Sequence, residues 1–277
     1  MKTSPVVAVI MSVYKNDNPN LLRMALDSIV KQTYPSEKVR IYLGIDGEIS
    51  QESESIIADC NAIYKCSRNE KNIGLGPTLN KLVNMLEDEA FVFRMDADDI
   101  SLPNRFEAQI NYMLENTGVD ILGTAIIEVS ESGEKLGVRT YPRENIQRYI
   151  AKGAPVAHPT ACFRRNVFEK INYSSTIRLN EDILLWFQAL KNGFCIDNLP
   201  DAMYRFLVDG AFFKRRNYKK SFGEFNIYMK GIWALHKITW LYAFPIARLI
   251  SRLLPERMIR VAYRSKFRKR LLNDIKT

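Results

Sequence analysis

The sequence predicts an α/β fold with a doubly wound, Rossmann-like sheet that becomes mixed in its second half and carries a basic helical appendage. Short apolar runs alternate with amphipathic helical segments over about the first 95 residues. Two further runs, 119–130 and 134–142, meet at Ser132-Gly133 in a hairpin-like pattern. From Phe212 to Thr277 there are 17 Lys and Arg residues against 3 Asp and Glu. This segment therefore has a net charge of +14. Because the whole chain has a net charge of +9, residues 1–211 have a net charge of −5.

The first half alternates strand and helix signals in order. Residues 6–13, VVAVIMSV, are typical of a strand that is buried on both faces. A helix follows, with Asn18 as its cap and Pro19 at its first position. Its expected apolar face consists of Leu22, Leu26, Ile29 and Val30. The later strands are expected at 39–46, 61–67 and 90–95, and the later helices at about 51–60 and 77–86.

The second half continues the same domain. Residues 180–194, NEDILLWFQALKNGF, predict a helix that Asn180 caps and Gly193 ends. Its expected apolar face consists of Ile183, Leu184, Phe187 and Leu190. No linker is visible before about residue 210. Residues 1–211 are therefore expected to form one catalytic domain, with 212–277 as the appendage.

Polar segments follow three of the predicted strands. These are Ser12–Tyr14, Asp46-Gly47 and Asp96–Asp98. Ligands of doubly wound sheets bind beyond the carboxyl ends of the strands, so we expect these segments to meet at one edge. Asp96 and Asp98 point to the same side if the chain stays extended. Two such carboxylates suit Mg²⁺ or Mn²⁺ together with phosphate oxygens.

The acidic segment could also be a solvated loop or an EF-hand. The aspartates can simply solvate a loop, with Asp99 or Ser101 capping a helix that begins near Pro103. An EF-hand is excluded, because Ser101 occupies the sixth loop position where glycine is needed, and a strand precedes the segment. Arg94, in an apolar setting just before the aspartates, is expected to pair with a nearby carboxylate rather than with phosphate.

Several broad classes of protein are disfavoured. The N-terminus lacks the pattern of a signal peptide. The four cysteines form no C-x-x-C pair, and we expect free thiols in a reducing cytosol. No RNP or zinc signature accompanies the basic appendage, which argues against a nucleic-acid partner.

The ordered motifs resemble a known family. VAVIMSVYKND, IDGE, the N-x-G of Asn72 and Gly74, RMDADD, HPTACFRR and NED occur in this order over about residues 5–210. This set resembles the inverting family-2 glycosyltransferases with a GT-A fold, and within them the bacterial amylovoran and O-antigen type.

The resemblance implies roles for matching positions on the nucleotide side. Asp98, with Asp96, would coordinate Mn²⁺ or Mg²⁺ beside the diphosphate, and Asp96 would alternatively reach the ribose. Asp46 would hydrogen-bond the uracil edge, although an Asp-Gly turn is the simpler interpretation. The remaining residues expected to bind the nucleotide sugar are Ser12, Val13, Tyr14, Asn72, Gly74, Asn80 and Ala97.

The resemblance also implies residues on the acceptor side. Glu181 and Asp182 would supply the general base, with Asp182 preferred. The alternative is that both only complement the helix dipole. His158 would touch the acceptor, the diphosphate or the metal, or would be a hydrogen-bonded structural residue.

The implied function is metal-dependent, inverting transfer of a hexosyl residue from a UDP-sugar (UDP-Glc, UDP-Gal or an N-acetyl form). The implied acceptor is a polyprenyl-diphosphate-linked glycan in O-antigen or exopolysaccharide biosynthesis. One alternative is a sugar-phosphate nucleotidyltransferase, although SVYKNDNPN lacks the glycines of such enzymes. Another is a non-catalytic protein that binds the membrane surface.

The appendage predicts peripheral attachment at the inner, cytoplasmic face of the cell membrane. Its apolar middle is interrupted by charges, so a membrane-spanning helix is not expected. Trp233, Trp240 and Tyr242 suit an interface. Beyond Pro255, an apolar stripe and an arginine stripe lie side by side. The alternatives are a helical appendage that packs on the catalytic domain, and a dimer contact.

Overall fold

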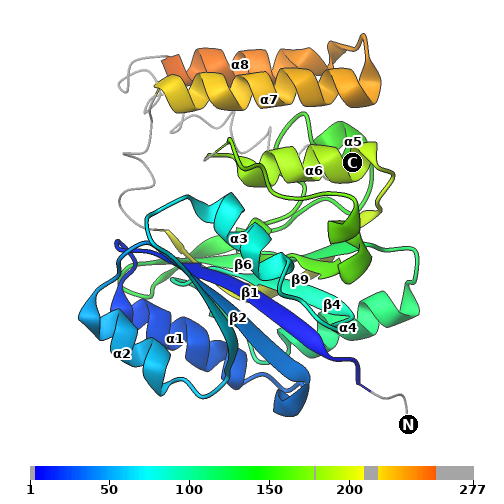
Figure 1. Cartoon of the computed structure of the whole chain (residues 1–277). Helices are drawn as coiled ribbons and strands as arrows, with labels where there is room; N and C mark the ends of the chain where they lie inside the picture. Colours follow the sequence, from blue (N-terminus) through cyan, green and yellow to red (C-terminus); the bar gives the residue numbers. More distant parts are fainter. Residues whose placement is uncertain (1–3, 178, 209–217, 254–277) are drawn as a thin grey trace.

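A mixed nine-stranded sheet forms the centre of the molecule. The computed structural model describes residues 4–177, 179–208 and 218–253. The strand order is β3-β2-β1-β4-β8-β6-β9-β5, and β7 pairs with β6 (Figure 1). The predicted α/β class, with a parallel first half and a mixed second half, is therefore confirmed.

The parallel half is built from four strands and three helices that alternate along the chain. Its strands are β1 (Val7–Val13), β2 (Val39–Asp46), β3 (Ile63–Asn69) and β4 (Phe91–Met95). Its helices are α1 (Pro19–Val30), α2 (Gln51–Asp59) and α3 (Leu75–Val83). All neighbouring strand pairs here are parallel, so their carboxyl ends lie at one edge.

The second half adds shorter and antiparallel elements. In chain order they are β5 (Ile100–Ser101), α4 (Arg105–Glu115), β6 (Ile121–Ser130), β7 (Lys135–Arg139), α5 (Ile146–Tyr149), β8 (Cys162–Arg164), α6 (Glu181–Lys191) and β9 (Ile196–Val208). Short 3-10 helices occupy Ser36–Lys38, His158–Thr160 and Arg165–Glu169. β8 joins the halves, because it runs antiparallel to both β4 and β6. β6 and β7 form the predicted hairpin.

Two apolar layers cover the sheet. On one face, α1, α2 and α4 contribute Leu22, Ile56 and Phe106 to a core that includes the alternate side chains of β1 and β2. On the other face, α3 and α6 contribute Leu82 and Trp186 (Figure 1). β1 is almost completely buried, as expected for a strand with helices on both sides.

Most helix signals are confirmed, and three are wrong. The Asn18 side chain caps α1 by accepting from the backbone N–H of Asn20, with Pro19 in the first turn. Val30, expected on the buried face of α1, is 48% exposed. α3 begins at Leu75, earlier than expected, because Gly74 turns the chain at φ 100°. Asn180 precedes α6 but adopts a left-handed conformation in which its side chain makes no capping hydrogen bond.

The described part of the appendage contains two helices, of which the first packs on α6. α7 (Tyr218–His236) and α8 (Ala243–Leu253) flank a short 3-10 helix, Trp240–Tyr242, and lie beyond α6 (Figure 1). The rings of Phe187 on α6 and Tyr228 on α7 meet edge to face, with centroids 5.6 Å apart. Among the residues in view, no helix is long and apolar enough to cross a membrane. The expected boundary at 211/212 and the stripes beyond Pro255 fall outside the described residues.

Close packing between β2 and α3 gives a testable prediction. A Cβ atom added at Gly44 would lie 2.5 Å from Cγ2 of Thr78, which is 1% exposed. We expect Gly44→Ala to lower the free energy of unfolding by roughly 1–3 kcal/mol, because a packed helix must shift. Urea unfolding measures it. Gly118→Ala, where a Cβ meets nothing within 4 Å, is the control; equal stability of the two variants would contradict the prediction.

Candidate active site

The ends of β1, β2 and β4 bring the predicted polar segments to one edge of the sheet. In the register of the parallel strands, Val13 lies opposite Ile45, and Met11 lies opposite Met95. Asp46 is the last residue of β2, and Tyr14 and Asp96 directly follow β1 and β4, so the three residues lie at the same edge of the sheet. This meeting of three distant segments is the arrangement that the strand pattern predicted.

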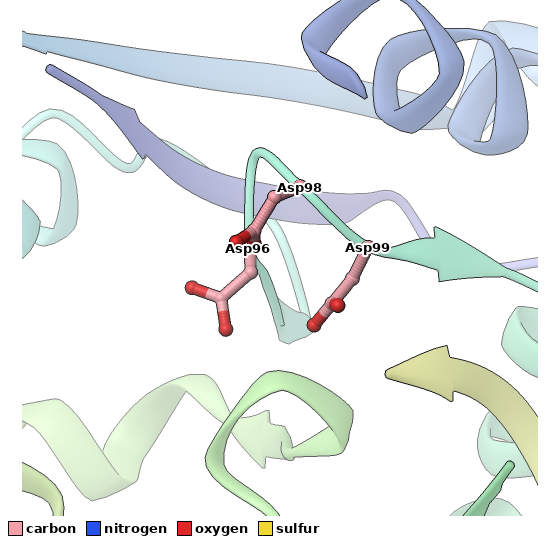
Figure 2. Close-up of side chains that lie close together, drawn as sticks. All are labelled: Asp96, Asp98 and Asp99. Carbon is pink, nitrogen blue, oxygen red and sulfur yellow. The ribbon is translucent and has the colours of Figure 1, made fainter. Parts of the chain in front are cut away.

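Three carboxylates gather in the turn after β4. One oxygen each from Asp96, Asp98 and Asp99 lies within 4.8 Å of the others. Figure 2 shows the three side chains around this turn. Asp98 is exposed, Asp96 is half-buried and Asp99 is 2% exposed. A cluster of this size and chemistry fits a hard divalent cation.

Asp99 belongs to this cluster and does not cap the following helix. Its Oδ1 accepts a hydrogen bond from the backbone N–H of Leu207 at 2.8 Å. Its Oδ2 is buried and has no hydrogen-bond partner among the described residues. Burial, then the charges of Asp96 and Asp98, hold the pKa of Asp99 well above its usual range. Ser101 does not cap either, since it lies in β5 and donates its N–H to the Ser28 hydroxyl.

A buried arginine lies beneath the cluster. Arg94 is 2% exposed and forms an ion pair with Asp96. This confirms the expected pairing with a carboxylate. Its Nε and Nη1 are buried without a hydrogen-bond partner in the described part of the chain. The Arg94 charge also acts on Asp99, Glu181 and Asp182, and in each case it opposes the rise in pKa that burial causes.

The loop after β1 adds a carboxylate that the sequence analysis missed. Oδ2 of Asp17 accepts from the backbone N–H of Tyr14 at 2.9 Å. Burial, with a contribution from Asp98 and Asp96, raises the pKa of Asp17 to about 7. The signal was the KND that directly follows Tyr14.

Asp46 holds the loop that leads into α3. Its Oδ1 accepts from the N–H of Ile73 at 2.8 Å, and its Oδ2 accepts from the N–H of Gly74 at 2.9 Å. The Asn69 side chain also donates to Oδ1, at 3.0 Å. Asn72, at the tip of the same loop, is exposed. Asp46 therefore shapes the N-x-G loop, a role that the sequence analysis did not foresee; its contact with uracil stays a prediction.

Asn80 links the parallel half to the second half. Its amide donates to the carbonyl of Tyr173 at 2.8 Å, and its side-chain oxygen accepts from the Tyr173 N–H at 3.0 Å. The Tyr173 hydroxyl in turn meets Nε2 of His158 at 2.8 Å. Burial, and then Arg94, hold the pKa of His158 well below its usual range, so the ring is neutral near pH 7. His158 is therefore a buried, hydrogen-bonded residue; its contact with the acceptor, the diphosphate or the metal stays a prediction.

Glu181 and Asp182 begin α6 and are both half-buried. Burial, then Asp182, raises the pKa of Glu181 to about 7, and Asp96 adds to the rise. Burial also raises the pKa of Asp182, against the opposing effects of the Ile183 N–H and Arg94. The structure therefore brings this acidic pair, 85 residues from the first cluster in sequence, into the electrostatic field of the same buried arginine.

The raised pKa of Glu181 predicts a pH-dependent stability. Between its ordinary value of 4.5 and about 7, the folded protein holds a proton that the unfolded chain has released. The contribution of the protonated Glu181 side chain to the stability of the fold is complete below pH 4.5, and it is lost as the pH rises through about 7. We therefore expect the melting temperature of Glu181→Gln to rise relative to that of the wild type as the pH increases from 4.5 to about 7. A constant difference between the two melting temperatures would contradict it.

The chain matches one family model. The family is described as Glycosyl transferase family 2, and its model matches residues 8–172. The matched region includes the polar ends of β1, β2 and β4 and ends just before Tyr173, so α6 lies beyond it.

Two curated relatives and one solved structure are similar to the chain. It is 33% identical over 215 residues to the UDP-Gal:alpha-D-GlcNAc-diphosphoundecaprenol beta-1,3-galactosyltransferase of Escherichia coli, covering 76% of each chain. It is 29% identical over 265 residues to the amylovoran biosynthesis glycosyltransferase AmsE of Erwinia amylovora, covering 92% of this chain and 97% of the relative. The S. aureus TarS 1–349 structure in complex with UDP-GlcNAc superposes with a TM-score of 0.68 at 19% identity, over 89% of this chain and 72% of that one.

Proposed function

Because the chain belongs to glycosyl transferase family 2 and is a glycosyltransferase of GT-A fold, we propose that it transfers a hexosyl residue from a UDP-sugar to a lipid-diphosphate-linked acceptor. The process that we assign to it is O-antigen or exopolysaccharide biosynthesis. Two relatives support this: one is named as acting on GlcNAc-diphosphoundecaprenol, and the other as an enzyme of amylovoran biosynthesis. Family membership sets aside the nucleotidyltransferase and non-catalytic alternatives.

One observation carries the proposal. Arg94 forms an ion pair with Asp96 of the carboxylate cluster at the carboxyl edge of the sheet, and its charge also acts on the acidic pair at the start of α6. Glycosyl transfer with inversion needs an acidic metal site for the leaving diphosphate and a separate carboxylate base. The site offers both.

The cluster fits Mn²⁺ or Mg²⁺ by its chemistry. Oδ2 of Asp99 is buried and has no hydrogen-bond partner within the described part of the chain, so it needs a proton or a cation. Asp96 and Asp98 place two more carboxylates within 4.8 Å. We assign Asp98 as the direct ligand, with Asp96 and Asp99 supporting it. A bound divalent cation supplies positive charge to the departing diphosphate. Arg94 keeps the Asp96 side chain in place from below.

The residues of this chain then have separate tasks in the transfer. Asp182 accepts the proton of the acceptor hydroxyl, whose oxygen attacks the anomeric carbon opposite the diphosphate. The bond from that carbon to the diphosphate breaks, its electron pair leaves with the diphosphate, and the configuration inverts. The Ile183 N–H and Arg94 favour the ionised form of Asp182 that this step requires.

The nucleotide is assigned to the loops at the ends of β1 and β2. Ser12, Val13 and Tyr14 would line the uridine pocket, with Asp46 at the uracil edge. Asn72, Gly74 and Ala97 would line the path to the diphosphate. Asn80 is reassigned from direct contact to positioning, since both polar atoms of its amide bind the Tyr173 backbone.

The appendage is proposed to rest on the cytoplasmic face of the membrane. Ile238 is 90% exposed, Trp240 is 70% exposed and Trp233 is 54% exposed, all in or beside α7 and the following 3-10 helix. Exposed aromatic residues beside a strongly basic segment favour an anionic lipid surface. Vesicle co-sedimentation with and without phosphatidylglycerol tests this attachment.

The experiment that tests the function is a donor screen with the full chain. We expect one of UDP-Glc, UDP-Gal, UDP-GlcNAc and UDP-GalNAc to label a GlcNAc- or GalNAc-diphosphate-lipid in the presence of Mn²⁺. NMR of the product is expected to show an inverted anomeric centre. Absence of transfer from all four donors, or retention of configuration, would contradict the proposal.

A further inference from the structure

A groove of about 440 Å³ runs between α6 and α7. Its volume lies within the roughly 300–1,000 Å³ of small-molecule sites. The walls are largely apolar, formed by Ile177, Leu179, Leu184, Phe187, Ile227 and Ala234. None of the described lining residues is acidic, whereas Lys191 and Lys230 are both exposed at the groove.

Two glycines of α7 give the groove its shape. A Cβ atom at Gly231 would lie 2.4 Å from the Phe187 ring, so this glycine lets the two helices approach closely. A Cβ atom at Gly223 would meet nothing within 4 Å. The helices are therefore in contact near Phe187 and leave open space near Gly223.

Three residues of the groove lining lie next to the acidic pair in the chain. Ile177 and Leu179 come just before the Glu181–Asp182 pair in the chain, and Leu184 comes just after it. Glu181, Leu184, Gln188 and Lys191 follow the i, i+3, i+7, i+10 spacing of one helix side. Leu184 and Lys191 are then about 10 Å apart along α6. A molecule whose reacting end lies at the acidic pair can therefore extend directly into the groove.

We propose that this groove binds the isoprenoid chain of the acceptor, with Lys191 and Lys230 interacting with its phosphate groups. The inference rests on the proposed function, which supplies an acceptor with a polyprenyl diphosphate. Apolar walls gain free energy by covering a hydrocarbon chain but offer little to a nucleotide or a free sugar. Two lysines without an acidic neighbour in the lining complement a diphosphate.

Gly223→Phe is the variant that tests the groove. The new ring enters open space on a helix whose backbone tolerates any side chain there, so we expect the fold to persist. Gly137→Phe, in β7, is the matched control, because a Cβ there also meets nothing within 4 Å. Lys191→Ala/Lys230→Ala tests the charges separately.

The measurement is calorimetric titration of the full chain with farnesyl diphosphate and with inorganic diphosphate. The wild type and Gly137→Phe are expected to bind farnesyl diphosphate at least tenfold more tightly than inorganic diphosphate. Gly223→Phe is expected to lose that preference, and the double lysine variant to bind both ligands more weakly. Equal affinity of the wild type for the two ligands, or an unchanged preference in Gly223→Phe, would overturn the inference. So would equally tight binding of dihexanoyl-phosphatidylglycerol, which would indicate a general lipid site.

Transfer assays separate this inference from the proposed function. With a GlcNAc-diphosphate acceptor, Gly223→Phe is expected to raise KM at least tenfold for an isoprenoid-linked form and to leave KM for a chain-free form unchanged. If the wild type transfers to neither acceptor, the proposed function fails while the titration still decides the groove. If the wild type uses both forms equally well, the function stands and the groove assignment is overturned.

Discussion

Replacing Asp98 with alanine is expected to lower the rate of sugar transfer by roughly 10²–10³-fold, the usual effect of removing a group that stabilises developing charge. Asp98 is the exposed member of the three-carboxylate cluster, so it is the one that reaches a ligand most directly. Steady-state kinetics with Mn²⁺ measure the loss. EDTA is expected to reduce the wild type to a similar level.

The control for Asp98→Ala is Asp59→Ala, an exposed carboxylate at the end of α2. It is expected to keep wild-type kinetics. A calorimetric titration with Mn²⁺ alone should show binding to the wild type and to Asp59→Ala, and none to Asp98→Ala. Full activity of Asp98→Ala, or of the wild type in EDTA, would remove the metal assignment.

The metal assignment also has a pH signature. Without a cation, burial and the two neighbouring carboxylates favour a proton on Asp99. Binding of a cation must displace that proton, so we expect the affinity for Mn²⁺ to rise with pH. The same titrations, repeated in buffers of different ionisation enthalpy, would report the released proton.

Replacing Asp182 with asparagine is expected to lower kcat by roughly 10²–10⁴-fold, the contribution of a positioned general base. Asparagine keeps the size of the side chain and removes only its ability to accept a proton. The variant should still bind the UDP-sugar with wild-type affinity, because the base contacts the acceptor side.

The neighbouring Glu181 provides the contrast for Asp182. Its pKa of about 7 leaves it partly protonated at neutral pH, whereas at Asp182 the Ile183 N–H is the largest effect that opposes the rise in pKa caused by burial. Glu181→Gln is therefore expected to change kcat by less than Asp182→Asn does. If the order of the two effects is reversed, Glu181 is the base. If neither variant loses activity, the acidic pair only complements the dipole of α6.

The parallel half of the fold was predictable because its signals are local. A run of eight apolar or small residues predicts β1, and Asn18 and Pro19 predict the start of α1. Burial of β1 and β4 between helices then follows from general rules of layered α/β folds. Val30 shows the limit of such reasoning, since apolar residues also occur on exposed faces.

The site residues that escaped prediction depend on turns. An extended chain would place Asp96 and Asp98 on one side and Asp99 on the other, but the turn after β4 brings all three together. Asp17 joins them because the loop after β1 folds back on the Tyr14 N–H. Asn180 takes a left-handed conformation that nothing in its local sequence announces, and it therefore does not cap α6.

The clamp between Asn80 and Tyr173 has a consequence for how such enzymes diversify. The Asn80 side chain binds the backbone N–H and carbonyl of residue 173, which lies 93 positions further along the chain. Any amino acid other than proline presents the same two groups at that position. Under the proposed function, the half that would bind the donor can thus be combined with acceptor-side halves of altered sequence while this contact is preserved, so residue 173 is a suitable junction for chimeric enzymes with new acceptor specificity.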